Sequence, residues 1–226
     1  MSIFSFFIKE KIKSQRDISF ENEINKLYKE KKYDEVISRA LTFRADEQEL
    51  SYHIKKKVAL SHYYKNDFEK SLTLFEEIAS IKNDVESWFN VLMSLMPLKK
   101  TQQGKAVFDK ILTMHKGLDP QQPRELAIPN IRFYYANGLA DNNLFNEALE
   151  QLEEIKKIYM TIVITDDTFV YIRGIPFLSS TLDLAKRVFK GLCSDISDSD
   201  FIKELINKVD DEGKKTIKNS LENECV

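Results

Sequence analysis

The residues best suited to metal binding or redox chemistry are three histidines and two cysteines, and their spacing forms no recognisable site. His53 and His62 are nine residues apart, so they lie about half a turn apart around a helix and cannot share one metal ion. His115 is isolated. Cys193 and Cys225 are far apart in a spacing that suits neither a disulfide framework nor a zinc site, which favours a reducing compartment.

The acidic residues that could serve catalysis lie where helices are expected to begin. Asp166, Asp167, Asp195, Asp198 and Asp200 are interpreted as helix caps or solvated acids, because negative charge stabilises a helix N-terminus. The six glycines are scattered and form no phosphate-binding loop. We therefore predict no catalytic residue, no metal site and no cofactor, and hence a protein that is not an enzyme.

Composition favours helices and excludes several partners. The chain has 226 residues, 42% apolar and 31% charged, with only six Gly and five Pro, which suits one helical domain or a short repeat array. Its net charge of -2 comes from 34 basic and 36 acidic side chains that are interspersed, so nucleic acid is not an expected partner. No apolar run approaches the roughly 20 residues that span a bilayer. We expect a cytoplasmic protein.

Residues 1–16 form an apolar and basic segment. The apolar residues Met1 to Ile8 precede Lys9, Lys11, Lys13 and Arg16, which is the reverse of the order in a secretory signal. Two alternatives remain. The segment either packs its phenylalanines on the first repeat as a cap, or forms an interfacial or partner-binding amphipathic helix.

An internal repeat organises most of the chain. Three segments share an aromatic residue, an acid or amide, a variable residue and a small or β-branched one, followed by large apolar or small residues four and seven positions on. They are Tyr33 to Val36 with Ala40 and Phe43, Phe68 to Ser71 with Phe75 and Ile78, and Phe145 to Ala148 with Leu152 and Ile155. A fourth copy has Gly104, Phe108 and Ile111, with Thr101 in place of the aromatic residue. Such stripes occupy one helix face, which neighbouring helices must bury.

This pattern resembles the tetratricopeptide repeat. Tyr33 to Ile37 is similar to the signature of the family's turn and second helix, Trp88 falls on its first-helix Trp, and Ala59 and Ala136 fall on its small position. The first-helix Leu-Gly pair is nowhere intact, and Lys55 and Arg132 replace an aromatic residue. The resemblance covers residues 17–160, and more weakly 166–192 through Phe169, Ala185, Phe189 and Leu192.

The resemblance implies an all-α, right-handed superhelical solenoid of helical hairpins with a C-terminal capping helix. Four hairpins are expected over residues 17–160, and a degenerate fifth hairpin with the capping helix over 161–226. The expected helices cover residues 19–31, 33–44, 47–65, 68–81, 85–98, 101–115, 124–141, 145–160, 168–179, 182–193 and 199–221. Residues 117–123 form an insertion, because two prolines and a glycine interrupt the helix there. Residues 160–165 are predicted as a helix end and linker, with a short strand as the alternative.

In proteins of this family the first helix of each hairpin lines the concave, ligand-binding surface. The same register predicts a strip of partner-binding residues here: Asn25, Tyr28, Lys29, His53, Lys56, Tyr63, Tyr64, Phe89, Met93, Phe133 and Asn137. Aromatic and Met side chains often dominate binding free energy. Alternatively, some of them, Phe89 and Met93 above all, pack between helices. The carboxylate clamp that some family members use matches here only at Asn25, which argues against that type of co-chaperone.

Three functional hypotheses follow. The first is a non-catalytic module that binds one protein in a concave groove, as an immunity protein neutralising a toxin or as a secretion chaperone; the immunity role is favoured because the sequence offers a binding surface and nothing to deliver. The second is a scaffold subunit of a larger, membrane-apposed assembly anchored through Phe4, Phe6 and Phe7. The third is a helical enzyme of unrecognised type. The sequence indicates no oligomeric state.

Overall fold

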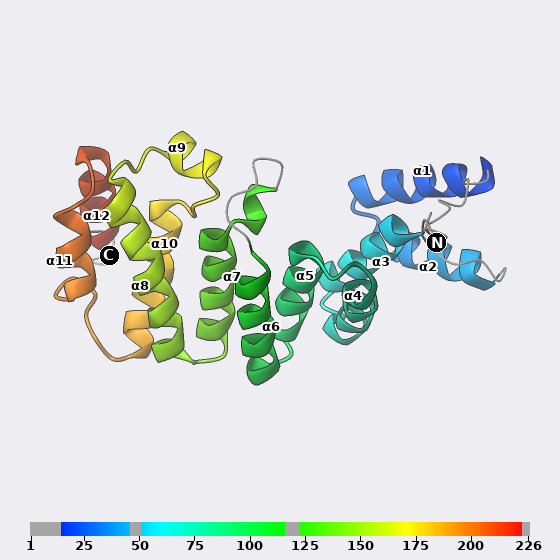
Figure 1. Ribbon diagram of the computed structural model, residues 1–226, viewed down its shortest axis with the longest axis horizontal. Coiled ribbons are helices and arrows are strands. Elements are labelled where there is room, and N and C mark those ends of the chain that lie inside the picture. Colours follow the sequence, from blue (N-terminus) through cyan, green and yellow to red (C-terminus); the bar gives the residue numbers. More distant parts are fainter. Residues whose placement is uncertain (1–14, 46–50, 116–122, 223–226) are drawn as a thin grey trace, which may run out of the picture. The chain divides into compact units, whose positions relative to one another are not determined.

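The computed structural model describes residues 15–45, 51–115 and 123–222, and all regular elements in these ranges are helical (Figure 1). The predicted all-α class is therefore confirmed. The chain forms two compact units, residues 1–74 and 75–226, with the boundary inside helix α4 (Phe68–Lys82). Nearly all of the N-terminal segment 1–16 and of the insertion 117–123 lies outside the described residues, so the predictions made for them stay predictions.

The first unit contains α1 (Gln15–Lys29), α2 (Tyr33–Ala45), α3 (Tyr52–Tyr64) and the start of α4. Helix α1 packs against both α2 and α3, so the first helices of successive hairpins are neighbours. The rings of Phe20 and Phe43 stack with their centroids 4.0 Å apart. The rest of this core consists of Ile24, Leu27, Val36, Ala40, Ile54 and Val58.

The second unit contains two regular hairpins followed by shorter helices. The hairpins are α5 (Val85–Leu95) with α6 (Thr101–Met114), and α7 (Ile128–Asp141) with α8 (Phe145–Ile162). After them come α9 (Asp167–Ile172), α10 (Leu178–Gly191), α11 (Asp200–Ile206) and α12 (Asp211–Glu222). Helix α5 packs against α7, α10 packs against α7, α8 and α12, and α11 packs against α8 and α12.

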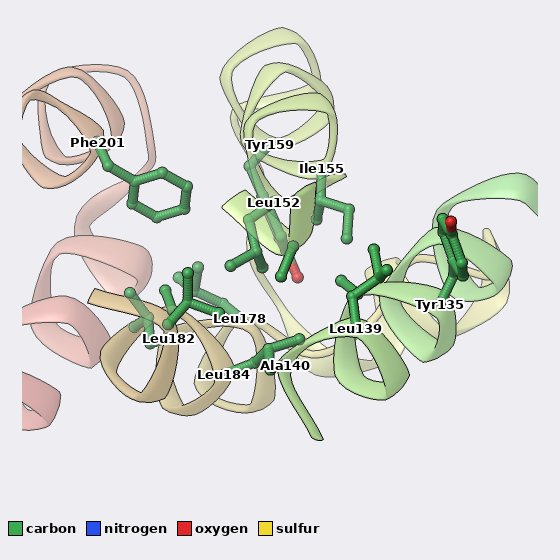
Figure 2. Close-up of a cluster of buried hydrophobic side chains, with 14 of the residues drawn as sticks. Tyr135, Leu139, Ala140, Leu152, Ile155, Tyr159, Leu178, Leu182, Leu184 and Phe201 are labelled. Atoms are coloured by element: carbon green, nitrogen blue, oxygen red, sulfur yellow. The ribbon is translucent and has the colours of Figure 1, made fainter. Parts of the chain in front are cut away.

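The core of the second unit lies between α7, α8, α10 and α11, whose apolar side chains point toward one another (Figure 2). Leu139, Leu152, Ile155 and Leu182 are almost completely buried. The Tyr159 hydroxyl is buried as well and donates a hydrogen bond to the backbone carbonyl of Pro176. This bond satisfies a polar group that would otherwise be costly to bury.

The first four hairpins have the same turn between their helices. Lys31, Asn66, Lys99 and Asn143 each lie two residues before the second helix and have φ between 58° and 60°. The amide of the next residue donates in each case to the carbonyl five residues earlier, for example Lys32 to Leu27 and Leu144 to Leu139. This is the hydrogen bond of a helix that ends in a left-handed residue.

The residues that anchor the repeat occupy equivalent positions. Val36, Ser71, Gly104 and Ala148 are all buried, and each amide donates to the carbonyl four residues earlier, just before its helix begins. The absence of a side chain at Gly104 lets Met96 pack closely, because a Cβ atom there would lie 2.8 Å from the Met96 sulfur. The repeat pattern in the sequence thus predicted a real structural equivalence.

Several predicted boundaries are wrong, and local chemistry explains them. Helix α3 begins at Tyr52, where Ser51 caps it. The helix predicted over 124–141 splits into a 3-10 turn (Arg124–Leu126) and α7, which has Pro129 in its first turn. The helix predicted over 168–179 ends at Ile172, because Gly174 has a φ of +62° and Pro176 cannot continue it.

The C-terminal part also differs from the prediction. Instead of one capping helix over 199–221, the chain forms α11 and α12 with a break at residues 207–210. The linker prediction for residues 160–165 is confirmed, since α8 ends at Ile162 and Val163 has a positive φ of 64°. Among the described residues, no helix has the length and apolar character required to cross a bilayer.

Candidate functional site

All eleven residues of the predicted strip lie at the surface of their own unit. Three are exposed (Lys29, His53 and Tyr64), and eight are half-buried (Asn25, Tyr28, Lys56, Tyr63, Phe89, Met93, Phe133 and Asn137). Seven of them belong to the first unit and four to the second. Each residue of the predicted strip is therefore at least partly accessible within its own unit.

Four tyrosines and a phenylalanine of the first unit form one continuous row, which we call the tyrosine cluster: Tyr28, Tyr33, Tyr63, Tyr64 and Phe68. Tyr33 stacks on Tyr64 with centroids 5.1 Å apart and lies 5.9 Å from Tyr28. Tyr63 contacts Tyr64 at 5.9 Å and Phe68 at 5.3 Å, both edge to face. The tyrosine cluster joins the ends of α1 and α3 to the starts of α2 and α4.

Burial and the neighbouring Tyr64 raise the pKa of Tyr28 well above its ordinary value. The Tyr28 hydroxyl therefore stays protonated at neutral pH and can act as a hydrogen-bond donor or acceptor. Tyr64 is 54% exposed, so the middle of the tyrosine cluster offers an aromatic surface to a partner.

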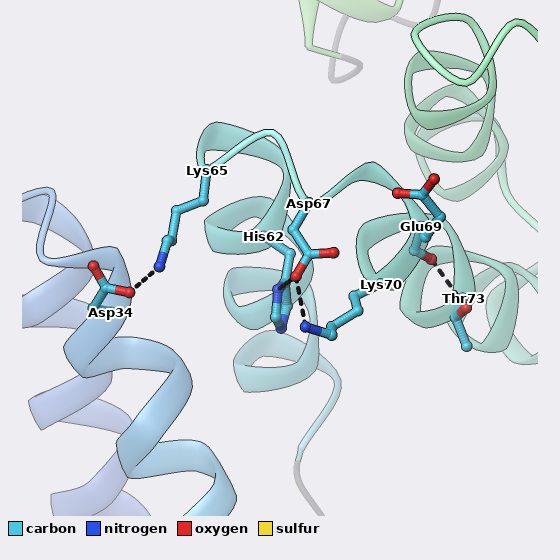
Figure 3. Close-up of polar contacts among 7 residues, drawn as sticks. All are labelled: Asp34, His62, Lys65, Asp67, Glu69, Lys70 and Thr73. Carbon is cyan, nitrogen blue, oxygen red and sulfur yellow. Dashed lines mark hydrogen bonds and ion pairs between the residues drawn. The ribbon is translucent and has the colours of Figure 1, made fainter.

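Ion pairs fix the turns beside the tyrosine cluster (Figure 3). Lys65, in the turn after α3, pairs with Asp34 of α2 and so links two successive hairpins. Asp67 accepts hydrogen bonds from the Lys70 ammonium at 2.8 Å and lies 3.1 Å from Nδ1 of His62. These bonds with Lys70 and His62 outweigh burial and lower the pKa of Asp67. His62 therefore has a structural role at this turn.

Among the remaining strip residues of the first unit, His53 and Lys56 lie away from the tyrosine cluster. His53 lies at the other end of α3, eleven residues before Tyr64, which corresponds to about 16 Å along the helix. Lys56 neighbours Lys57, whose pKa is lowered mainly by burial, against the attraction of Glu21. Within the first unit, the predicted strip thus has an aromatic end and a basic end and is not one compact patch.

In the second unit, Tyr134 joins two of the predicted residues. It lies 5.7 Å from Phe89 and 5.9 Å from Phe133, measured between ring centroids. Phe89 and Phe133 also pack against the core, so the alternative that such residues pack between helices is correct for part of their surface. Tyr134, which the sequence reasoning missed, is 37% exposed and carries the accessible part of this aromatic group.

Asn137 is held by a residue from a distant part of the sequence. The Arg187 guanidinium of α10 donates to the Asn137 side chain at 2.5 Å, to its carbonyl at 3.1 Å and to Asp141 at 2.8 Å. This arginine was not predicted, because the repeat pattern is weak in the region of α10. It links α7 to α10 at the surface of the second unit.

Known protein families give no direct assignment. No family model matches the chain, and no curated protein matches it. Within the described residues, no group of three or more His, Cys, Asp or Glu side chains is arranged to hold a metal ion.

Solved structures do match. The kinesin light chain TPR-like repeats from Podosopora anserina are 13% identical, with a TM-score of 0.60 over 93% of this chain and 97% of that one. The fold is tetratricopeptide-repeat-like. PlcR of Bacillus thuringiensis, in a structure with the peptide PapR7 and DNA, is 14% identical with a TM-score of 0.52 over 94% of this chain and 77% of PlcR. Similarity at these identities establishes the tetratricopeptide-like fold alone.

Proposed function

We propose that this tetratricopeptide-like chain is a non-catalytic module that binds one protein partner through the surface of its first helices. The observation that carries the proposal is the tyrosine cluster, in which rings from successive hairpins meet at the surface. Tyrosine contributes large contact area with little loss of side-chain entropy, and it is enriched among residues that dominate binding.

The residues proposed to bind the partner are those of the predicted strip, with Tyr33 and Tyr134 added because of their ring contacts. A peptide is present in the PlcR structure. We extend peptide or protein binding to this chain as part of the proposal, and we do not extend DNA binding, because the charges of this chain are balanced.

For the biological role we favour an immunity protein that neutralises a toxin, with a secretion chaperone as the related alternative. Both roles need a stoichiometric complex with one protein and no catalysis. The competing role is a scaffold subunit of a larger assembly attached through Phe4, Phe6 and Phe7. The identity of the neighbouring genes separates these roles, since an adjacent toxin gene favours the first.

The proposal is tested with a double substitution in the tyrosine cluster, Tyr63→Ala with Tyr64→Ala. Co-purification of the tagged chain from its native host should return a single stoichiometric partner. The double variant should weaken that complex at least tenfold, because each buried aromatic contact contributes about 1–2 kcal/mol of binding free energy. Affinity is measured by titration calorimetry.

Leu41→Ala is the matched control, because Leu41 belongs to the same unit and is 62% exposed without being in the strip. It should leave the affinity unchanged. Circular dichroism of the double variant must show the helix content of the parent chain. An unchanged affinity in a folded double variant would remove the tyrosine cluster from the interface. Recovery of a large assembly that is lost on deletion of residues 1–16 would instead support the scaffold role.

A further inference from the structure

The second unit contains a pocket of about 600 Å³ at the C-terminal end of α10. Three cationic side chains of that helix line it, namely Lys186, Arg187 and Lys190. The loop that follows contributes Cys193, Asp195 and Ile196. The lining therefore carries an excess of positive charge, with three cationic side chains and one carboxylate.

The three cations differ in how far they are already engaged. Arg187 is held by Asp141 and Asn137. Lys186 donates to the backbone carbonyl of Ser220 in α12, which is a neutral partner. Within the described ranges neither Lys186 nor Lys190 has an ion pair, so neither charge has a direct anionic partner at the pocket.

The geometry favours a singly charged anion. Two lysines one turn apart on a helix can both reach one carboxylate. Asp195 keeps its carboxylate in the lining, where it accepts from the Ser197 amide at 2.8 Å, and it would repel a dianion more strongly than a monoanion.

We propose that this pocket binds the carboxylate of an acidic segment in a protein partner, with Lys186 and Lys190 as the ion-pair donors. Arg187 connects the pocket to Asn137 of the predicted strip, so one partner can contact both. The inference rests on the proposed function only for the source of the segment. The preference of the pocket for a carboxylate can be measured without that partner.

The test uses the full chain with Cys225→Ser, which leaves Cys193 as the one thiol because the sequence contains two cysteines. Cys193 is exposed and lines the pocket, so its alkylation by the neutral reagent iodoacetamide reports whether the pocket is occupied. The probe is the blocked peptide acetyl-Leu-Glu-Asp-Leu-Glu-Asp-amide, labelled for fluorescence anisotropy. Its Gln and Asn counterpart and inorganic phosphate serve as comparison ligands.

We expect the saturating acidic peptide to slow Cys193 alkylation at least threefold and the amide peptide to leave it unchanged. Lys186→Gln and Lys190→Gln should each weaken peptide binding by about threefold to tenfold, because each removes one partly screened ion pair. Lys208→Gln is the matched control, since Lys208 is exposed and lies beyond the other end of α11. It should bind like the parent chain.

Three results would overturn the inference. They are equal binding of the acidic and amide peptides, unchanged alkylation at peptide concentrations that saturate the anisotropy signal, and equal protection by phosphate at the same concentration. If Lys190→Gln behaves as expected while the native partner does not depend on Tyr63 and Tyr64, the tyrosine interface fails and the pocket stands. If Lys190→Gln leaves peptide binding unchanged while the native partner depends on Tyr63 and Tyr64, the pocket is rejected and the tyrosine interface stands.

Discussion

Tyr33 is the side chain on which the tyrosine cluster depends. It begins α2, yet its ring stacks on Tyr64 from the next hairpin and also lies near Tyr28 from its own. Aromatic pairs at such distances add about 0.5–1.5 kcal/mol each beyond the burial of their area. Tyr33 therefore couples the surface that we propose for binding to the stability of the first unit.

The substitution Tyr33→Leu should lower the free energy of unfolding by about 1–2 kcal/mol, because it keeps an apolar side chain and removes both ring contacts. Urea unfolding followed by circular dichroism measures this change. The exposed Leu41 again supplies the control, and Leu41→Ala should cost less than about 0.5 kcal/mol. Equal stability of Tyr33→Leu and the parent chain would show that the stacked rings contribute nothing to folding.

Individual surface residues could be predicted only where the repeat fixes the register. Tyr28, Tyr63 and Tyr64 follow from their positions on the first helices. Tyr134 was missed because it is adjacent to Phe133 and off the expected face, although it joins Phe133 to Phe89. The contacts of Arg187 with residues 46 and 50 positions earlier depend on tertiary packing, which no local pattern encodes.

Helix α12 depends on a single capping residue. Asp210 accepts hydrogen bonds from the Gly213 amide at 2.9 Å and from the Thr165 hydroxyl at 2.6 Å and amide at 3.1 Å. It thereby ties the linker after α8 to the start of α12. The capping signal was present in the sequence, since Asp210 precedes a helix with acidic residues in its first turn. A single helix over 199–221 was predicted because the apolar spacing continues across the break.

The variant Asp210→Ala should lose about 1–2 kcal/mol of stability at pH 7, as expected for the loss of a helix cap. Burial alone would raise the pKa of Asp210, but the bonds from Thr165 and Gly213 together lower it below its ordinary value. The contribution of Asp210 to the free energy of unfolding is therefore complete above the pKa that this carboxyl has in the unfolded chain. It is lost as the pH falls through the lower pKa that the carboxyl has in the folded chain.

Urea unfolding between pH 7 and pH 2 provides the measurement. The stability difference between the parent chain and Asp210→Ala should shrink as pH falls below about 4, the ordinary pKa of an aspartate. Asp211→Ala is the neighbouring control, because the Asp211 side chain is fully exposed. Asp211→Ala should lower the free energy of unfolding only slightly at any pH. A difference that stays constant across this range would exclude the charged carboxylate as the stabilising group.

The molecule has two separate cores of unequal size. The core of the first unit consists of residues 20–58 with partly buried neighbours that include Leu74, and every residue of the second core follows position 84. Because a small domain buries too little apolar surface to be very stable, the first unit should be the weaker one.

A fragment of residues 84–226, which starts at the Asp84 cap of α5, should therefore fold on its own. We expect it to unfold cooperatively with a midpoint within a few degrees of the main transition of the full chain. The fragment of residues 1–82 should be marginal, with a broad transition at lower temperature. Calorimetry of the three proteins makes the comparison. Loss of helix content in fragment 84–226 would show that the second core requires residues that precede position 84.

The tetratricopeptide-like architecture could be predicted because the same pattern occurs in several copies, so a departure in one copy is outweighed by the others. Val36, Ser71, Gly104 and Ala148 occupy equivalent helix positions, as the spacing indicated. The division into two units was not foreseen. The boundary lies inside α4, where the repeat pattern continues without interruption from Ser71 to Phe75 and Ile78. The right-handed superhelix across both units stays a prediction.

The left-handed turns carry a consequence for engineering. Lys31, Asn66, Lys99 and Asn143 occupy a conformation that glycine adopts without steric cost, and none of the four is glycine. Replacing these four residues with glycine should therefore raise the thermal stability of the chain, and none of them belongs to the predicted strip. Such substitutions would stabilise the fold without changing the residues proposed to bind a partner.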